Sequence, residues 1–245
     1  MSTSRGYLFV FTLLVLLSVA ATNAQGYVIN GLLDDWGVTP FVQWAPSNSS
    51  ISWIEEDNWG STHPDFPYGG EIYDVEAMYC DPFGAMSYVA LVTSFPNTGY
   101  AYTNPGDLGI DLNRDGIYEY GLKMTGAYAG GLFANPTWTS TTTYPISSPA
   151  RIAVTSSTLL DIQPLVYQSC GIMENGHLTY IMEGRFDWSL LGNPSDPFDL
   201  HWTMTCGNDC LDLTVYPVPE PASFLLLGSG LAGLWAMARR KKKKI

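Results

Sequence analysis

The sequence predicts an all-β protein: an antiparallel β-sandwich of the jelly-roll or immunoglobulin-like kind, with an apolar segment at each end. Between residues 25 and 216, short runs with strand periodicity alternate with Pro, Asn-Gly and Asp-Gly turn signals. No amphipathic run in this body is long enough to indicate a helix. With 46% hydrophobic, 13% aromatic and only 14% charged residues, the composition argues against disorder and against a helical bundle.

Residues 1–24 have the three parts of a secretory signal peptide. Arg5 supplies the positive start, residues 7–17 are apolar, and small residues precede a cleavage point after Ala24. The alternative is an uncleaved anchor, although the apolar run is short for a membrane span of about 20 residues. We therefore expect Sec-type export, followed by a single exported domain at 25–216.

The strands of this domain are expected in ten runs. The alternation in 74–79 and the β-branched, apolar run 87–93 give the clearest signals. The others are 41–45, 51–55, 107–111, 118–125, 152–155, 178–187, 200–206 and 211–215. Residues 137–158, rich in Thr, Ser and Pro, are either a surface excursion or an edge hairpin. About 190 residues suffice for a sandwich core.

The charge of the body excludes one class of partner. Between residues 25 and 217, four basic residues oppose 22 acidic ones, a net charge of −18. Nucleic-acid binding depends on clustered Lys and Arg, so we expect no nucleic-acid partner. Attraction of divalent cations, or solubility alone, fits this charge.

The last 29 residues, 217–245, form a second targeting segment. Val218–Ser223 contains the triplet Pro219, Glu220 and Pro221. An apolar stretch at 224–238 with three glycines follows, and then the basic tail 239–245. The pattern predicts a short transmembrane helix whose basic end stays in the cytoplasm while the body lies outside the membrane.

This combination resembles the PEP-CTERM sorting signal of bacterial proteins. The resemblance implies recognition by exosortase, a membrane-embedded transpeptidase-like cysteine protease that removes the tail. It also implies a Gram-negative bacterium that makes extracellular polysaccharide. The precursor would be held transiently in the inner membrane, and the mature form would reach the cell surface or the extracellular matrix. A permanent single-span anchor is the alternative.

Several phrases of the body resemble β-sandwiches of the family-9 carbohydrate-binding-module type. These are residues 29–36, 73–79, 88–92, 183–188 and 201–209. The resemblance implies a sandwich fold and recognition of extracellular polysaccharide.

One loop has the spacing of calcium ligands. Asp111, Asn113 and Asp115 fall at positions 1, 3 and 5, Gly116 falls at position 6, and Glu119 falls at position 9. Position 12 is a leucine, so the bidentate glutamate of an EF-hand is absent. The alternative is a hairpin turn capped by its own Asp and Asn side chains.

Exposed tryptophans stack on sugar rings, whereas buried ones fill cores. Trp53 and Trp59 border a polar segment and, with Trp138, are the candidates for ligand contact. Trp36 and Trp188 are expected to pack in the core.

Four cysteines in an exported chain indicate disulfides rather than a metal site. Three pairings are open, and the sequence does not choose among them: the residues are Cys80, Cys170, Cys206 and Cys210.

No catalytic motif stands out. The nucleophile elbow, the zinc-protease motif and the phosphate loop are all absent from the sequence. Glu76 and Glu183 are the obvious carboxylates for glycoside cleavage, but inward-facing carboxylates also bind cations or stabilise structure. We expect a non-enzymatic, exported binding or structural sandwich that recognises carbohydrate with calcium. The alternatives are a secreted glycan-active hydrolase and a matrix component without a ligand.

Overall fold

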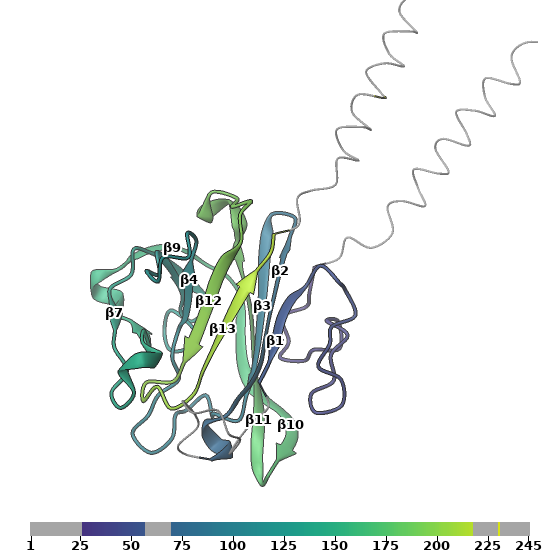
Figure 1. Cartoon of the computed structure of the whole chain (residues 1–245), viewed down its shortest axis with the longest axis vertical. Helices are drawn as coiled ribbons and strands as arrows, with labels where there is room; N and C mark the ends of the chain where they lie inside the picture. Colours follow the sequence, from purple (N-terminus) through teal and green to yellow (C-terminus); the bar gives the residue numbers. More distant parts are fainter. Residues whose placement is uncertain (1–25, 57–69, 218–229, 231–245) are drawn as a thin grey trace, which may run out of the picture.

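The computed structural model describes residues 26–56, 70–217 and 230 (Figure 1). The signal peptide, Trp59, the sorting triplet, the basic tail and all of the expected transmembrane helix except Gly230 lie outside these residues. Within the described part of the chain, no helix has the length and apolar character needed to cross a membrane.

Two antiparallel sheets form the body (Figure 1). The first has, in spatial order, β1 (Ser52–Glu55), β2 (Val75–Phe83), β3 (Met86–Thr93), β11 (His177–Asp187) and β10 (Leu165–Glu174). The second has β13 (Cys210–Val215), β12 (Phe198–Thr203), β4 (Leu108–Asp111), β5 (Tyr120–Leu122), β6 (Gly131–Ala134) and β9 (Thr158–Ile162). The predicted all-β, antiparallel architecture is confirmed.

The main core lies between the two sheets. Alternate residues of β2, β3 and β11, such as Met78, Leu91 and Met182, are buried there against Leu200 and Leu213 of the second sheet. Because side chains alternate across a strand, the intervening residues of the first sheet point to its other face.

That outer face is also covered. Residues 26–51 run over it and bury Trp36 and Trp44 against Tyr79 and Val92 in a second apolar cluster. The first sheet is thus buried on both faces, which explains the nearly continuous burial of β2 and β3.

The expected strands 41–45 and 152–155 were wrong. Of the second, only Ile152 lies in a strand, and Val154–Ser156 form a 3-10 turn. Residues 41–45 form no strand, because Phe41 has a φ of 60°, which breaks the extended backbone. The strands β6, β9 and β10 were not predicted, since their runs are short or interrupted by glycine and polar residues.

Residues 137–158 take the edge-hairpin form. β7 (Trp138–Thr139) pairs with β8 (Arg151–Ile152). Among the described residues of the body, helical structure is limited to short 3-10 turns: η1 (Glu71–Tyr73), η2 (Pro145–Ser147), η3 (Val154–Ser156) and η4 (Trp188–Leu191).

Candidate functional site

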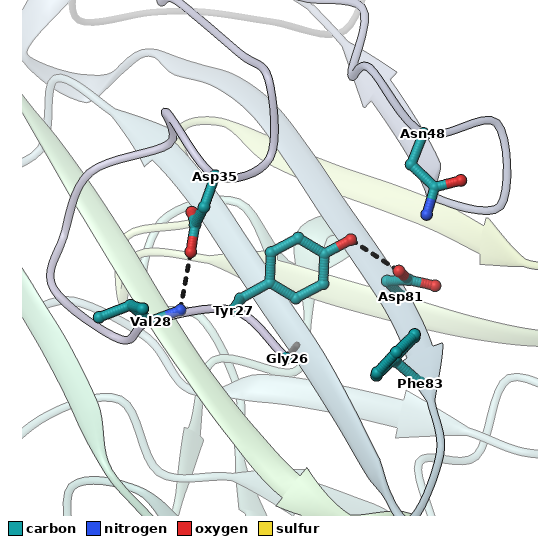
Figure 2. Close-up of a pocket in the computed structure, with 7 residues that line it drawn as sticks. All are labelled: Gly26, Tyr27, Val28, Asp35, Asn48, Asp81 and Phe83. Atoms are coloured by element: carbon teal, nitrogen blue, oxygen red, sulfur yellow. Dashed lines mark hydrogen bonds between the residues drawn. The ribbon is translucent and has the colours of Figure 1, made fainter. Parts of the chain in front are cut away.

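A surface pocket lies where the N-terminal segment passes over the end of β2 (Figure 2). Its volume is about 400 Å³, within the range of small-molecule sites. The segment contributes Tyr27, Asp35 and Asn48, and β2 contributes Asp81 and Phe83.

Tyr27 is one of the lining residues of this pocket, and its ring contacts two other aromatic rings. The ring stacks on Trp36 with centroids 4.0 Å apart, and it meets the ring of Tyr88 at 64° with centroids 5.1 Å apart. The hydroxyl of Tyr27 donates a hydrogen bond of 2.6 Å to Oδ2 of Asp81. Burial, followed by the neighbouring Asp81 carboxylate, raises the pKa of Tyr27 well above its usual value. The phenol therefore remains protonated and fixes the orientation of Asp81.

Asp35 supplies a second carboxylate. One oxygen accepts the backbone N–H of Val28 at 2.7 Å, and burial, reinforced by repulsion from Asp34, raises the pKa of Asp35. The pocket thus offers carboxylate acceptors, the Asn48 amide and aromatic surface, with no Lys or Arg among the described residues that line it. Such a lining suits a ligand rich in hydroxyl groups and disfavours an anion.

The predicted calcium loop is a tightly hydrogen-bonded turn after β4. The Asp111 carboxylate accepts backbone N–H groups from Asn113, Arg114, Asp115 and Gly116, at distances from 2.6 to 3.3 Å. These are the hydrogen bonds expected of a self-capped turn, the alternative to a calcium site.

The same loop retains carboxylates in a group. Oxygens of Asp111, Asp115 and Glu119 lie within 4.8 Å of one another. The Asn113 amide donates to Glu119 at 2.7 Å, which joins the two ends of the loop. The geometry therefore admits both a capped turn and a cation.

The tryptophans separate into core and surface. Trp36 and Trp188 are buried, as expected. Trp53 on β1 is 37% exposed and stacks over Tyr79. Trp138 is half-buried, donates its indole N–H to the carbonyl of Tyr118 at 3.1 Å, and meets the Tyr118 ring with centroids 6.2 Å apart.

Glu183 has a structural environment. Its Oε1 accepts the indole N–H of Trp36 at 3.0 Å, and its Oε2 accepts the backbone N–H groups of Asn30 and Gly31 at 2.8 Å each. Burial raises the pKa of Glu183, and these three donors oppose that effect. Glu76 belongs to another network, through the hydroxyl of Ser94 at 2.9 Å. The two carboxylates that the sequence suggested for glycoside cleavage, Glu76 and Glu183, therefore belong to two different hydrogen-bond networks.

The disulfide expectation was wrong: all four cysteines are free. Cys80 lies in the main core and contacts the hydroxyl of Ser87 at 3.4 Å, whereas Cys170 packs against the outer cluster. Cys210 begins β13 opposite Thr203, so the hairpin register does not pair it with Cys206.

The pocket residues were missed by reasoning from the sequence. Tyr27 lies just after the expected cleavage site, and Asp81 and Phe83 have no feature in the sequence that separates them from ordinary strand residues. The one sequence feature that could have indicated the pocket is the segment 29–36. Its apolar residues must be buried, and in the structure they pack on the outer face of the first sheet.

Residues 217–242 match the PEP-CTERM protein-sorting motif. Comparison with curated proteins and with solved structures finds no match for this chain. The motif contains Pro219, Glu220 and Pro221, and it indicates an exported, membrane-anchored precursor that exosortase processes.

Proposed function

We propose that the exported sandwich is a non-enzymatic module that binds neutral or amino sugars of extracellular polysaccharide in the pocket around Tyr27. The observation that carries this proposal is that two aromatic side chains, Tyr27 and Phe83, and two carboxylates, Asp35 and Asp81, line the same pocket. The resemblance of the body to carbohydrate-binding sandwiches points the same way.

The chemistry of the pocket selects among sugars. Carboxylates such as Asp35 accept hydrogen bonds from pairs of sugar hydroxyls, and the face of Phe83 offers an apolar surface for a pyranose ring. A uronic acid would place its carboxylate beside Asp35 and Asp81 with no basic lining residue to compensate. Neutral and amino sugars avoid that repulsion.

The sorting motif supports a place for this activity. Removal of the tail would leave the sandwich at the cell surface or within the matrix, where polysaccharide is abundant. Intact-mass measurement of the mature protein should show that residues 224–245 are gone. A mature protein that keeps them would instead support the permanent anchor.

Binding is tested with the purified protein and a panel of neutral, amino and uronic oligosaccharides in isothermal titration calorimetry. Asp35→Asn and Phe83→Ala should each weaken binding at least tenfold, whereas Asp196→Asn, an exposed change outside the pocket, should not. Equal affinity of the pocket variants and the wild type would reject this pocket. Appearance of new reducing ends on any of these sugars would favour the hydrolase instead.

We also propose calcium as a ligand of the loop at Asp111, Asn113, Asp115 and Glu119. The grouping of three carboxylates in this loop supports it. Asp111→Asn should then remove one calcium-binding event from a titration. An unchanged titration would leave the loop as a capped turn.

A further inference from the structure

The chain contains two Asn-Gly pairs, Asn30-Gly31 and Asn175-Gly176. In such a pair the backbone nitrogen of the glycine can attack the side-chain amide carbon of the asparagine, because glycine has no side chain to hinder the approach. The attack requires that this nitrogen is free and that the local backbone can move. The structure gives the two pairs opposite surroundings in both respects.

The first pair is held in place. The N–H groups of Asn30 and Gly31 both donate to Oε2 of Glu183, at 2.8 Å each. The side-chain oxygen of Asn30 accepts the N–H of Leu32 at 2.7 Å, so the side chain is fixed as well. Gly31 is buried, and a Cβ at this position would lie only 2.7 Å from the side-chain nitrogen of Gln168. The attacking nitrogen is therefore already bonded, and its segment is closely packed.

The second pair is free at the corresponding nitrogen. Asn175 and Gly176 form the two-residue turn between β10 and β11, where Glu174 faces His177. Both turn residues are exposed, with φ values of 43° and 89°. Within the described part of the chain, the N–H of Gly176 makes no hydrogen bond. A Cβ added to Gly176 would meet no heavy atom within 4 Å beyond its chain neighbours, so the backbone has room to move.

The same turn extends beyond the neighbouring strand. Thr93, the last residue of β3, faces Tyr180 on β11, so the turn lies past the end of β3 at the tip of its hairpin (Figure 1). Nδ2 of Asn175 donates to Oε2 of Glu71 at 2.9 Å and to Oε1 of Glu174 at 3.4 Å. Neither bond holds the attacking backbone nitrogen. A hairpin tip of this kind opens locally at a lower free energy than a segment packed on a sheet.

We propose that Asn175 is a site of spontaneous deamidation in the folded protein and that Asn30 is protected from it. The nitrogen of Gly176 gives its proton to solvent base and bonds to Cγ of Asn175. The Cγ–Nδ2 bond then breaks, and the nitrogen leaves as ammonia after taking a proton from water. Water opens the resulting five-membered succinimide at either of its two carbonyl carbons, so position 175 becomes aspartate or isoaspartate. The overall reaction consumes one water and releases one ammonia.

The modification would replace a hydrogen-bond donor by an acceptor beside two acids. A carboxylate at position 175 has no hydrogen to donate to Glu71 or Glu174, and it repels both. Glu71 is only 4% exposed, so water replaces the lost donor poorly. Isoaspartate also lengthens the backbone by one atom, which disturbs the pairing of Glu174 with His177. Deamidation would therefore weaken this end of the sandwich in molecules that have aged.

The test is incubation of the purified full chain at mildly alkaline pH, followed by peptide mapping with mass spectrometry. The peptide that contains residue 175 should gain the mass of an NH₂-to-OH replacement and separate into aspartyl and isoaspartyl forms. Asn175 should react at least tenfold faster than Asn30. The unfolded chain in urea is the internal control: both pairs are free there, so the two rates should agree within about twofold.

Two results would overturn the assignment. One is deamidation of Asn30 in the folded protein as fast as that of Asn175. The other is an Asn175 that stays intact in the folded protein while it reacts in urea. Neither measurement needs a variant, so the proposal remains testable whatever a substitution does to folding.

The effect on stability is tested with Asn175→Asp, which reproduces one product. This variant should lower Tm by about 2–4 °C relative to the wild type. Asn193→Asp is the matched control, because Asn193 is also an exposed asparagine with a positive φ, 52°, and it should leave Tm unchanged. An Asn175→Asp protein as stable as the wild type would refute the predicted weakening.

Discussion

Replacing Glu183 by glutamine should loosen the N-terminal segment from the outer face of the first sheet. The carboxylate accepts three N–H donors from that segment: the indole of Trp36 and the backbones of Asn30 and Gly31. A glutamine side chain has one acceptor oxygen. If that oxygen keeps the two backbone donors, the glutamine NH₂ faces the Trp36 indole, and two donors oppose each other in a buried site.

The magnitude follows from these contacts. Losing a hydrogen bond to a charged acceptor costs about 1.5–3 kcal/mol, and the two remaining bonds weaken because their acceptor becomes neutral. Replacing a buried carboxylate by a neutral amide recovers part of this cost, in line with the raised pKa of Glu183. We expect a net loss of about 1–3 kcal/mol in the free energy of unfolding.

A double-mutant cycle with Trp36→Phe isolates the contact. The single change Trp36→Phe removes the indole donor and some packing, so Glu183→Gln in that background no longer creates opposed donors. The two changes together should therefore be less destabilising than the sum of the singles, by about 1–2 kcal/mol.

Urea unfolding followed by far-UV circular dichroism measures all four proteins, with a constant m-value as the check for two-state behaviour. Glu55→Gln, an exposed change on β1, should stay within about 0.5 kcal/mol of the wild type. Additive effects of the Trp36 and Glu183 changes, within about 0.5 kcal/mol, would refute the stabilising role of the hydrogen bond between Trp36 and Glu183.

Three other predictions use different parts of the molecule. Lys123→Met should destabilise the fold by about 3–5 kcal/mol in urea unfolding, because it leaves the buried Asp107 carboxylate without its cation, 2.6 Å away; a loss below about 1 kcal/mol would show that the ion pair is dispensable. Tyr102→Gly should stabilise the protein by about 0.5–1 kcal/mol, since Tyr102 has a φ of 70° at a fully exposed turn and gives up no packing; a lower unfolding midpoint would contradict this. Burial raises the pKa of the Cys80 and Cys210 thiols to about 12, so in the native protein at pH 8 both should react with a thiol reagent far more slowly than in urea; equal rates in the two conditions would show that these thiols are accessible.

The strands that the sequence predicted are those with a strong local signal. β2, β3 and β11 combine β-branched or aromatic residues with alternation, and their expected runs overlap the observed ones. β10 was not predicted, because Gly171 lies at a bulge within it and most of its residues are half-exposed. Its sequence therefore lacks the apolar periodicity of a buried strand. The apolar residues at 41–45 belong to a loop, not to a strand. They are apolar because the loop packs Phe41 and Trp44 on the first sheet.

The sites depended on contacts that no local pattern encodes. The sequence marked Glu183 as a notable carboxylate, but its partners at 30, 31 and 36 lie about 150 residues away in the chain. The sequence also marked Glu76, as a carboxylate for glycoside cleavage or, if it faced inwards, for cation binding or structural hydrogen bonding. A bulge between Val75 and Ala77 and the adjacent turn η1 bring it into a group with Glu71, which only the folded sheet shows.

The excess of acidic residues and the export signal both bear on how the carboxylates of the body are stabilised. With four basic residues for 22 acids, most carboxylates of the body need other partners. Glu183 and Asp111 satisfy this need with N–H donors. For the loop that contains Asp115 and Glu119 we have proposed calcium, and extracellular calcium sites commonly bind at about 10⁻⁴–10⁻³ M. A site of that affinity would be filled after export and not in the cytoplasm, so it would stabilise the sandwich only once the chain has crossed the membrane.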